Sequence, residues 1–269
     1  MLTSIDKDHL LFSSAEYNND IIAFNLMELI RTSPLVLLSN GNSAIVGRTH
    51  PSTPFWIWTS NNITDYESQK VCENIINHLR ECKSIKIVAK LEFIEYFSRA
   101  VIDIAEITFK TDMQSYECNN VIIPKITDVT ITHPSDDDLE LLAEFYKQYY
   151  FECWGKNALD ADCIEAAKKN LANPDFLVLY KDNKIVSMVG ISKKDDKYAR
   201  INQVYTSIEH RCKGYAASVV AELCKRALAE GKTPMLYADI ANPASNKVYR
   251  NIGFKPRGKV SEIWVEIKS

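Results

Sequence analysis

The stretch Val204-Tyr205-Thr206-Ser207-Ile208-Glu209-His210-Arg211-Cys212-Lys213-Gly214-Tyr215-Ala216 decides the fold of this chain. An apolar run over residues 199–206 predicts a strand, and a helical pattern follows from Tyr215 to Glu230. A strand, a glycine-containing turn and a helix in this order place unpaired backbone N–H groups at a helix N-terminus. Because the helix dipole is positive there, such a turn binds phosphate oxygens. Gly214 would let a phosphate group approach the backbone closely.

A second segment, Asn242-Pro243-Ala244-Ser245-Asn246-Lys247-Val248-Tyr249-Arg250-Asn251-Ile252-Gly253-Phe254, lies one helix and one strand further on. The spacing of Arg211, Gly214 and Ala216 resembles the acyl-coenzyme A binding motif of the GNAT superfamily of N-acyltransferases, Arg/Gln-x-x-Gly-x-Gly/Ala. Residues 242–254 resemble the same superfamily's Asn-x-x-Ala/Ser-x-x-x-Tyr-x-x-x-Gly-Phe motif. The family usually has Gly where this chain has Cys212. This departure reduces the range of backbone conformations that the turn can adopt.

The resemblance implies acetyl-coenzyme A as co-substrate, with no metal. It implies that pantetheine lies between two diverging strands and bonds main-chain groups of Val204 and Thr206. A backbone N–H near Tyr205 is the expected group that polarises the thioester carbonyl. The expected coenzyme A contacts are Val204, Tyr205, Thr206, Arg211, Cys212, Lys213, Gly214, Tyr215, Ala216, Asn242, Ser245 and Tyr249.

Tyr249 stands where the family usually keeps its general acid. A phenol with a pKa of about 10 can protonate a leaving thiolate whose thiol has a pKa of roughly 8.5. The alternative is that Tyr249 only packs or hydrogen-bonds the sulfur. Asn242 is expected to cap the following helix and, with Ser245, to touch the pantetheine arm, although capping alone explains Asn242. Asp239, Glu209 and a chain of waters are the alternatives for the general base.

Composition limits the classes of partner. The chain has 269 residues, 46% of them hydrophobic and 25% charged, with a net charge of −3, which gives no reason to expect nucleic acid or an anionic membrane as partner. No apolar run approaches the length of a membrane span, and the N-terminal residues do not resemble a secretory signal. Seven scattered cysteines and five histidines form no metal motif. These features predict a cytoplasmic protein.

The N-terminal half repeats the order of elements expected in the second half. It predicts a helix over residues 15–31, strands at 35–39, 44–48 and 55–59, a helix from 64 to about 82, a strand at 85–89, a helix at 91–104 and a strand at 106–116. We interpret this half as a degenerate copy of the same architecture. The corresponding turn, residues 60–64, has no glycine and should not hold a pyrophosphate. The alternative is an unrelated α/β domain.

The second half predicts a strand at 129–132, helices from about 135 to 152 and at 161–171, and a hairpin of strands 176–180 and 184–192. A strand at 235–240, the helix that ends at Gly253 and a last pair of strands reaching Lys268 follow. The two helices resemble the family's acceptor-side cover. Their aromatic side chains either line a substrate pocket or are core: Phe145, Tyr149, Tyr150, Phe151 and Trp154.

The predicted fold class is α/β (α+β), with mixed, mostly antiparallel sheets flanked by helices in two tandem GNAT-like domains, residues 1–127 and 128–269. The expected function is transfer of an acetyl or short acyl group from coenzyme A to a primary amine of a small-molecule acceptor. A non-catalytic acyl-coenzyme A binding module and a structural α/β domain without coenzyme A are the alternatives.

Overall fold

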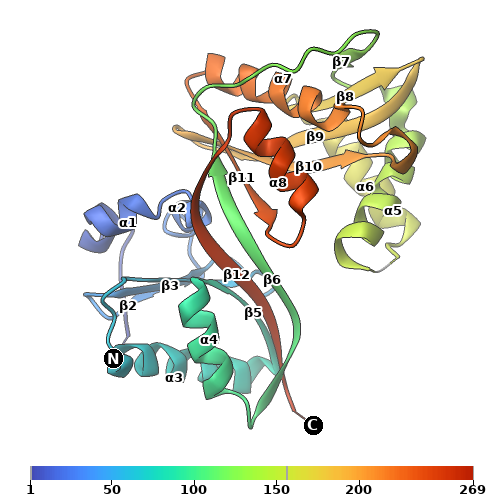
Figure 1. Cartoon of the computed structure of the whole chain (residues 1–269). Coiled ribbons are helices and arrows are strands. Elements are labelled where there is room, and N and C mark those ends of the chain that lie inside the picture. The colour runs from blue at the N-terminus through green and yellow to red at the C-terminus, as the bar shows by residue number, and fades with distance from the viewer. Residues whose placement is uncertain (1, 156, 269) are drawn as a thin grey trace. The chain divides into compact units, whose positions relative to one another are not determined.

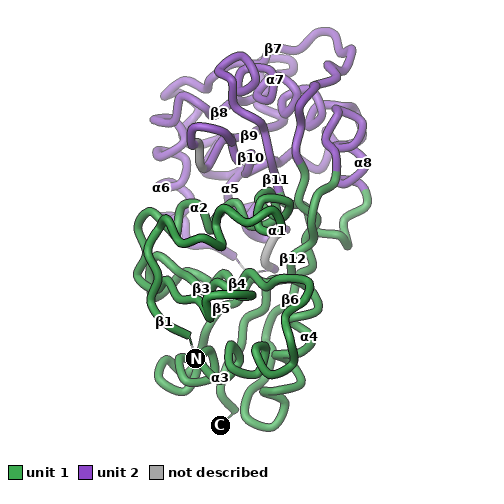
Figure 2. The backbone as a smooth tube through the Cα atoms, turned by 90° about the vertical axis from the view of Figure 1, so that its left-hand side faces the viewer, with its two compact units in different colours: residues 1–116, 237–243, 256–269 green, residues 117–236, 244–255 purple. Residues whose placement is uncertain are grey.

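The computed structural model describes residues 2–155 and 157–268, and it divides into two compact units. The first unit contains residues 1–116, 237–243 and 256–269, and the second contains residues 117–236 and 244–255 (Figure 2). The C-terminal strand therefore belongs to the first unit, whereas the sequence analysis assigned it to the second domain.

The first unit consists of a mixed sheet with helices packed against it (Figure 1). Its strands lie in the order β1-β2-β3-β4-β5-β12-β6. Strands β4 and β5 are parallel, with Phe55 opposite Ile87 and Ile57 opposite Ala89, whereas β2–β3, β3–β4 and β5–β12 are antiparallel. The elements are β1 (Thr3–Ser4), α1 (Ala15–Asn19), α2 (Asn25–Ile30), β2 (Val36–Ser39), β3 (Ala44–Arg48), β4 (Phe55–Thr59), α3 (Asp65–Cys82), β5 (Ser84–Ala89), α4 (Leu91–Ala100), β6 (Ala105–Glu117) and β12 (Lys255–Ile267).

The prediction of one helix over residues 15–31 is wrong, because the segment forms the two short helices α1 and α2. The interruption begins at Asp20. Its carboxylate accepts a hydrogen bond from Trp58 Nε1 at 2.9 Å and pairs with Lys90 Nζ at 2.7 Å. These tertiary contacts hold Asp20 where the helix ends, and a helical period alone does not reveal them.

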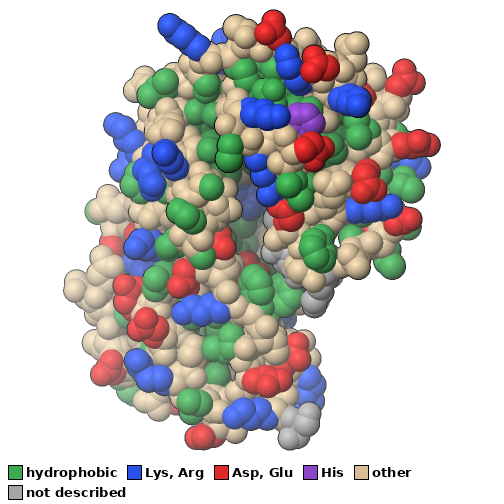
Figure 3. All heavy atoms as spheres, turned by 45° about the vertical axis from the view of Figure 1, so that its right-hand side comes forward, with side chains coloured by type: hydrophobic (Ala, Val, Ile, Leu, Met, Phe, Trp, Pro, Cys, Tyr) green, Lys and Arg blue, Asp and Glu red, His purple; other side chains and the backbone are tan. Residues whose placement is uncertain are grey.

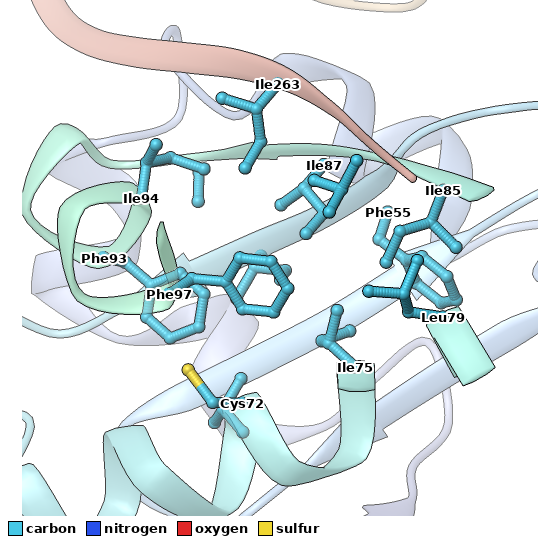
Figure 4. Packing of buried hydrophobic residues seen from close by; sticks show 14 of the residues in the cluster. Phe55, Cys72, Ile75, Leu79, Ile85, Ile87, Phe93, Ile94, Phe97 and Ile263 are labelled. Carbon is cyan, nitrogen blue, oxygen red and sulfur yellow. The ribbon is translucent and has the colours of Figure 1, made fainter. Parts of the chain in front are cut away.

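One hydrophobic core of the first unit lies between α3, α4 and one face of the sheet (Figure 4). Phe93 and Phe97 of α4 point toward Cys72 of α3, and Ile75 and Leu79 continue the apolar stripe of α3. Thr64 caps α3 in a capping box with Glu67. Helix α4 ends at Ala100, a turn earlier than predicted.

The prediction of a last pair of strands is also wrong, because residues 255–267 form the single strand β12. Gly258 makes no turn. It allows a close approach instead, since a Cβ atom there would lie 2.8 Å from the Cβ of Ala23. Beyond it, β12 pairs with β5 from Ser261 opposite Ala89 to Glu266 opposite Ser84.

The second unit carries the strand order β11-β10-β9-β8-β7. Asp182 and Asn183, with φ of 51° and 60°, form the two-residue turn of the predicted β8–β9 hairpin. The elements are β7 (Thr130–Thr132), α5 (Leu139–Trp154), α6 (Asp160–Leu171), β8 (Phe176–Lys181), β9 (Lys184–Lys194), β10 (Tyr198–Thr206), α7 (Tyr215–Ala229), β11 (Thr233–Asp239) and α8 (Pro243–Asn251).

The same order of elements occurs twice along the chain. A helical pair, three strands, a helix, a strand, a helix and a strand run from α1 to β6 and again from α5 to β12. The predicted class, a mixed and mostly antiparallel fold flanked by helices, is confirmed. Within the described residues, no helix is both long and apolar enough to cross a membrane.

The position of β12 predicts where its side chains stabilise the protein. Ile263 is fully buried in the core that contains Ile87 and Phe97. Ile263→Ala should lower the free energy of unfolding by about 2–5 kcal/mol, the usual cost of truncating a buried isoleucine. Glu266→Ala, on an exposed position of the same strand, should change it by less than about 0.5 kcal/mol. Urea unfolding measures both, and equal effects of the two substitutions would contradict this packing.

Candidate functional site

Strand β10 leaves its parallel neighbour before it ends. The ladder to β11 runs from Tyr198 opposite Thr233 to Arg200 opposite Met235, whereas β10 continues to Thr206. A bulge interrupts the pairing with β9 after Asn202, where Gln203 has a φ of +55°. Bulges bend a strand and increase its local twist.

The turn after β10 adopts a left-handed backbone at two positions. Cys212 has a φ of +60° and Gly214 a φ of +83°. Glycine takes this conformation without strain, whereas other L-residues pay roughly 1–2 kcal/mol. Cys212, which stands where the family usually has glycine, therefore occupies a strained position in the turn.

The first backbone N–H groups of α7 lack protein acceptors. Among the described residues, none accepts a hydrogen bond from the N–H of Gly214, Tyr215, Ala216 or Ala217. Gly214 is the N-cap and has no side chain that could cap the helix. These donors lie at the positive end of a helix of 15 residues, which is a favourable place for an anion.

Protein partners hold the Arg211 side chain. Its Nη2 donates to both carboxylate oxygens of Glu152, at 2.7 and 2.5 Å, and its Nε donates to the Thr206 carbonyl at 3.0 Å. Burial opposes the charge of Arg211, but the hydrogen bond and charge of Glu152 outweigh it and raise the Arg211 pKa. Sequence reasoning missed Glu152, because its place at the end of a helix says nothing of a partner 59 residues away.

Tyr205 ties the strand end to α5. Its hydroxyl donates to Gln148 Oε1 at 2.7 Å, and its ring meets Phe145 edge-on at 5.3 Å. Burial, followed by the charge of Glu152, raises the pKa of Tyr205 to about 12. The phenol is thus neutral across the physiological range, and it positions α5 against β10.

The predicted aromatic cluster of α5 is divided between core and surface. Phe145 is buried, Tyr149 and Tyr150 are half-buried, and Phe151 is exposed. The side chain of Trp154 and the whole of Lys156 lie outside the described residues.

Tyr249 lies on α8 and is 8% exposed. Its ring meets Phe254 edge-on at 5.9 Å, and its carbonyl accepts the Phe254 N–H at 3.0 Å. Gly253 between them is required, because its φ is +103° and a Cβ atom there would lie 2.2 Å from the Asn120 carbonyl oxygen. The Gly-Phe pair therefore anchors the C-terminal end of the helix that carries Tyr249.

The remaining candidate residues are distributed over both units. Asp239 and Asn242 belong to the first unit, and the Asn242 N–H donates to the Asp239 carbonyl at 3.1 Å. Ser245 lies in the second unit and is half-buried. The exposed Glu209 accepts, through its carbonyl, a hydrogen bond from Lys213 Nζ at 3.0 Å.

In the corresponding turn of the first unit, protein side chains accept several backbone N–H groups. The N–H of Asn61 donates to Glu16, and the N–H of the N-cap Thr64 donates to Glu67 at 2.9 Å. The Thr64 N–H, followed by the Thr64 hydroxyl, lowers the pKa of Glu67 to about 2. The start of α3 is therefore capped by side chains, whereas the start of α7 has no side-chain cap.

Side chains of both charges are interspersed on the face shown in Figure 3, without an extended patch of one sign. Among the residues that the structure describes, no cluster of His, Cys, Asp and Glu could hold a metal ion.

Several solved structures share this fold. A GCN5-related N-acetyltransferase from Sphaerobacter thermophilus aligns with a TM-score of 0.66 and 11% identity over 100% of this chain and 96% of that chain. One from Kribbella flavida aligns with a TM-score of 0.60 and 15% identity over 95% and 97%. A tandem GNAT protein from the clavulanic acid biosynthesis pathway has a TM-score of 0.53 and 10% identity over 99% and 98%. At these identities the likeness concerns the fold.

The left-handed position of Cys212 generates a stability prediction. Cys212→Gly should raise the free energy of unfolding by about 0.5–1 kcal/mol, because relief of backbone strain exceeds the entropy that glycine adds to the unfolded chain. Cys212→Val should lower it by about 1–2 kcal/mol, since a β-branched residue tolerates this conformation poorly. Urea unfolding of both variants measures the difference, and an equal stability of the two would show that the turn does not require a left-handed residue.

The comparison with family models agrees with the geometry of the second unit. Residues 139–254 match the acetyltransferase (GNAT) family, and this range contains both the turn after β10 and the helix of Tyr249. None of the curated proteins compared with the chain matches it. Residues 139–254 are therefore similar to the acetyltransferase (GNAT) family, on a chain whose fold is that of solved GNAT acetyltransferases.

Proposed function

We propose that the second half of the chain transfers an acetyl or short acyl group from coenzyme A to a primary amine of a small molecule. The observation that carries the proposal is the row of N–H groups from Gly214 to Ala217, which have no protein acceptor among the described residues. They lie at the start of α7, directly after the strand that leaves its parallel neighbour. These donors fit the oxygens of a pyrophosphate.

Direct transfer needs no covalent enzyme intermediate. The neutral amine attacks the thioester carbonyl carbon and forms the C–N bond, after which the C–S bond breaks and the thiolate leaves. Tyr249 donates its phenolic proton to this sulfur, and the proton of the attacking amine passes to a base, either Asp239, Glu209 or water. The products are the amide and free coenzyme A, and Tyr249 is reprotonated from solvent.

The contacts of Arg211 indicate that it and the main-chain N–H groups have different roles in the turn. Because Glu152 and the Thr206 carbonyl hold its guanidinium, main-chain N–H groups supply the principal donors for phosphate in this proposal. Arg211 then orients the turn relative to β10 and α5.

The first unit is proposed to be a degenerate copy that does not bind the pyrophosphate of coenzyme A. Glu67 accepts the N–H of the N-cap Thr64 and Glu16 accepts that of Asn61, so a phosphate at this turn would face two carboxylates. In the second candidate function, a non-catalytic acyl-coenzyme A binding module, the strained Cys212 would mark a turn that binds without turnover.

Tyr249→Phe separates an enzyme from a binding module. Addition of acetyl-coenzyme A at about 100 times its Kd should stabilise both the parent and the variant by roughly 2.7 kcal/mol, measured as a shift in melting temperature. Release of free thiol against a library of amines should be about 10²–10³-fold slower in the variant, because the leaving thiolate lacks its proton donor.

Tyr66→Phe is the matched control, since Tyr66 is 68% exposed on α3. It should leave both measurements unchanged. An unaltered rate in Tyr249→Phe would reject the proton-donor role, and the absence of a shift with acetyl-coenzyme A would reject coenzyme A binding itself.

Glu152→Gln tests the contact that holds Arg211. Loss of this carboxylate frees the guanidinium and removes a negative charge near the turn, so coenzyme A should bind about two- to fivefold more tightly. Glu140→Gln, an exposed carboxylate at the start of the same helix, should not change the affinity. Titration calorimetry at two salt concentrations measures the effect, and weaker binding of Glu152→Gln would show that the ion pair organises the site instead of competing with it.

A further inference from the structure

The first unit contains a cavity at the C-terminal ends of its parallel strands β4 and β5. It has a volume of about 400 Å³, within the usual size range of small-molecule sites. Phe93, which packs in the core (Figure 4), also lines this cavity. The lining residues are Thr59, Ser60, Asn61, Ile63, Asp65, Ser68, Lys90, Glu92, Phe93, Tyr96 and Arg99.

Three buried hydroxyl groups line this cavity without a partner. Thr59, Ser60 and Ser68 are only 3%, 8% and 7% exposed, and within the described chain none of their hydroxyls makes a hydrogen bond. They are not among the side-chain polar atoms that are sealed inside protein without a partner. Their oxygens therefore reach the cavity surface. Buried polar groups normally have partners, so these three are available to a polar ligand.

The cavity also has a positive side. Helix α4 begins at Leu91 beside it without a side-chain cap, and the N–H groups of Leu91, Glu92 and Phe93 have no acceptor in the described part of the chain. Arg99, which lines the cavity from the same helix, makes no ion pair with any described residue. An uncapped helix start and a guanidinium together suit a carboxylate.

The opposite charge is present as well. Asp65 and Glu92 line the cavity, and neither is in an ion pair within the described chain, whereas Lys90 is already paired with Asp20 at 2.7 Å. A ligand with only a negative charge would be repelled by these two carboxylates. A ligand with only a positive charge would be repelled by Arg99 and the N-terminus of α4. The lining is matched to a ligand that carries both charges.

We propose that this cavity binds a small zwitterion of the amino-acid class. The ligand's carboxylate faces Arg99 and the first turn of α4, its ammonium group faces Asp65 and Glu92, and the hydroxyls of Thr59, Ser60 and Ser68 bond its polar atoms. The first unit would then keep a ligand site at its strand ends, although Glu16 and Glu67 accept N–H groups of its turn. This site is separate from the acyl-transfer residues, which lie outside the cavity lining.

Titration calorimetry of the full chain with each of the twenty standard amino acids tests the proposal. At least one should bind with a Kd below about 10 mM. Its decarboxylated amine and its N-acetyl derivative each lack one charge, so each should bind about tenfold more weakly. No binding by any amino acid, or equal binding of the three matched probes, overturns the proposal.

Variants locate the site. Arg99→Gln should weaken binding of that amino acid about tenfold, and Thr59→Val, which keeps the side-chain shape, should weaken it about threefold or more. Thr59→Val should also leave the melting temperature of the free protein unchanged or higher, because the hydroxyl has no partner to lose. Arg80→Gln, an exposed arginine on α3 outside the cavity lining, is the control and should bind as the parent does.

The design distinguishes this site from the acceptor site of acyl transfer. An amino acid that binds at the second unit would retain its affinity in Arg99→Gln and Thr59→Val, and that result overturns the proposal. Acetyl-coenzyme A should shift the melting temperature of both variants as it shifts that of the parent. Loss of that shift would show that the variants disturb the whole fold and that the cavity is not an independent site.

Discussion

The unsatisfied N–H groups at the start of α7 are the constraint on which the candidate site depends. A helix leaves its first donors unpaired, and most helices satisfy them with a side chain or with water. Here the N-cap is Gly214, which has no side chain to offer, and the turn before it takes a left-handed backbone at Cys212 and Gly214. The donors are thereby kept for a ligand, directly after a strand that has left its neighbour.

The two halves of the chain treat the same structural position in opposite ways. Each has a strand, a turn and a long helix in the same order. In the second half Gly214 leaves the first donors of the helix without a side-chain cap, whereas in the first half Thr64 and Glu67 form a capping box and Glu16 accepts the Asn61 N–H. A carboxylate is a favourable partner for a helix N-terminus, and here the protein itself supplies it. Loss of one ligand site does not require loss of the fold around it.

Much of the fold was predictable because it follows from local patterns. The hairpin of β8 and β9, the helix that starts near residue 64 and the helix that starts at Tyr215 were predicted correctly from neighbouring residues. The errors occurred where distant residues intervene. Asp20 ends α1 while it bonds Trp58 and Lys90, and residues 255–267 form one strand, with Gly258 against Ala23, where a pair of strands was expected.

The sequence by itself determined the similarity of residues 139–254 to the GNAT family, the order of the elements and the positions of Gly214 and Tyr249, because each depends on short spacings along the chain. Only the tertiary structure decided that β12 completes the first unit beside β5, that Glu152 holds Arg211, and that Glu16 accepts the Asn61 N–H. These contacts join residues far apart in sequence. Their formation depends on which surfaces pack together when apolar side chains are buried, and no local spacing records that choice.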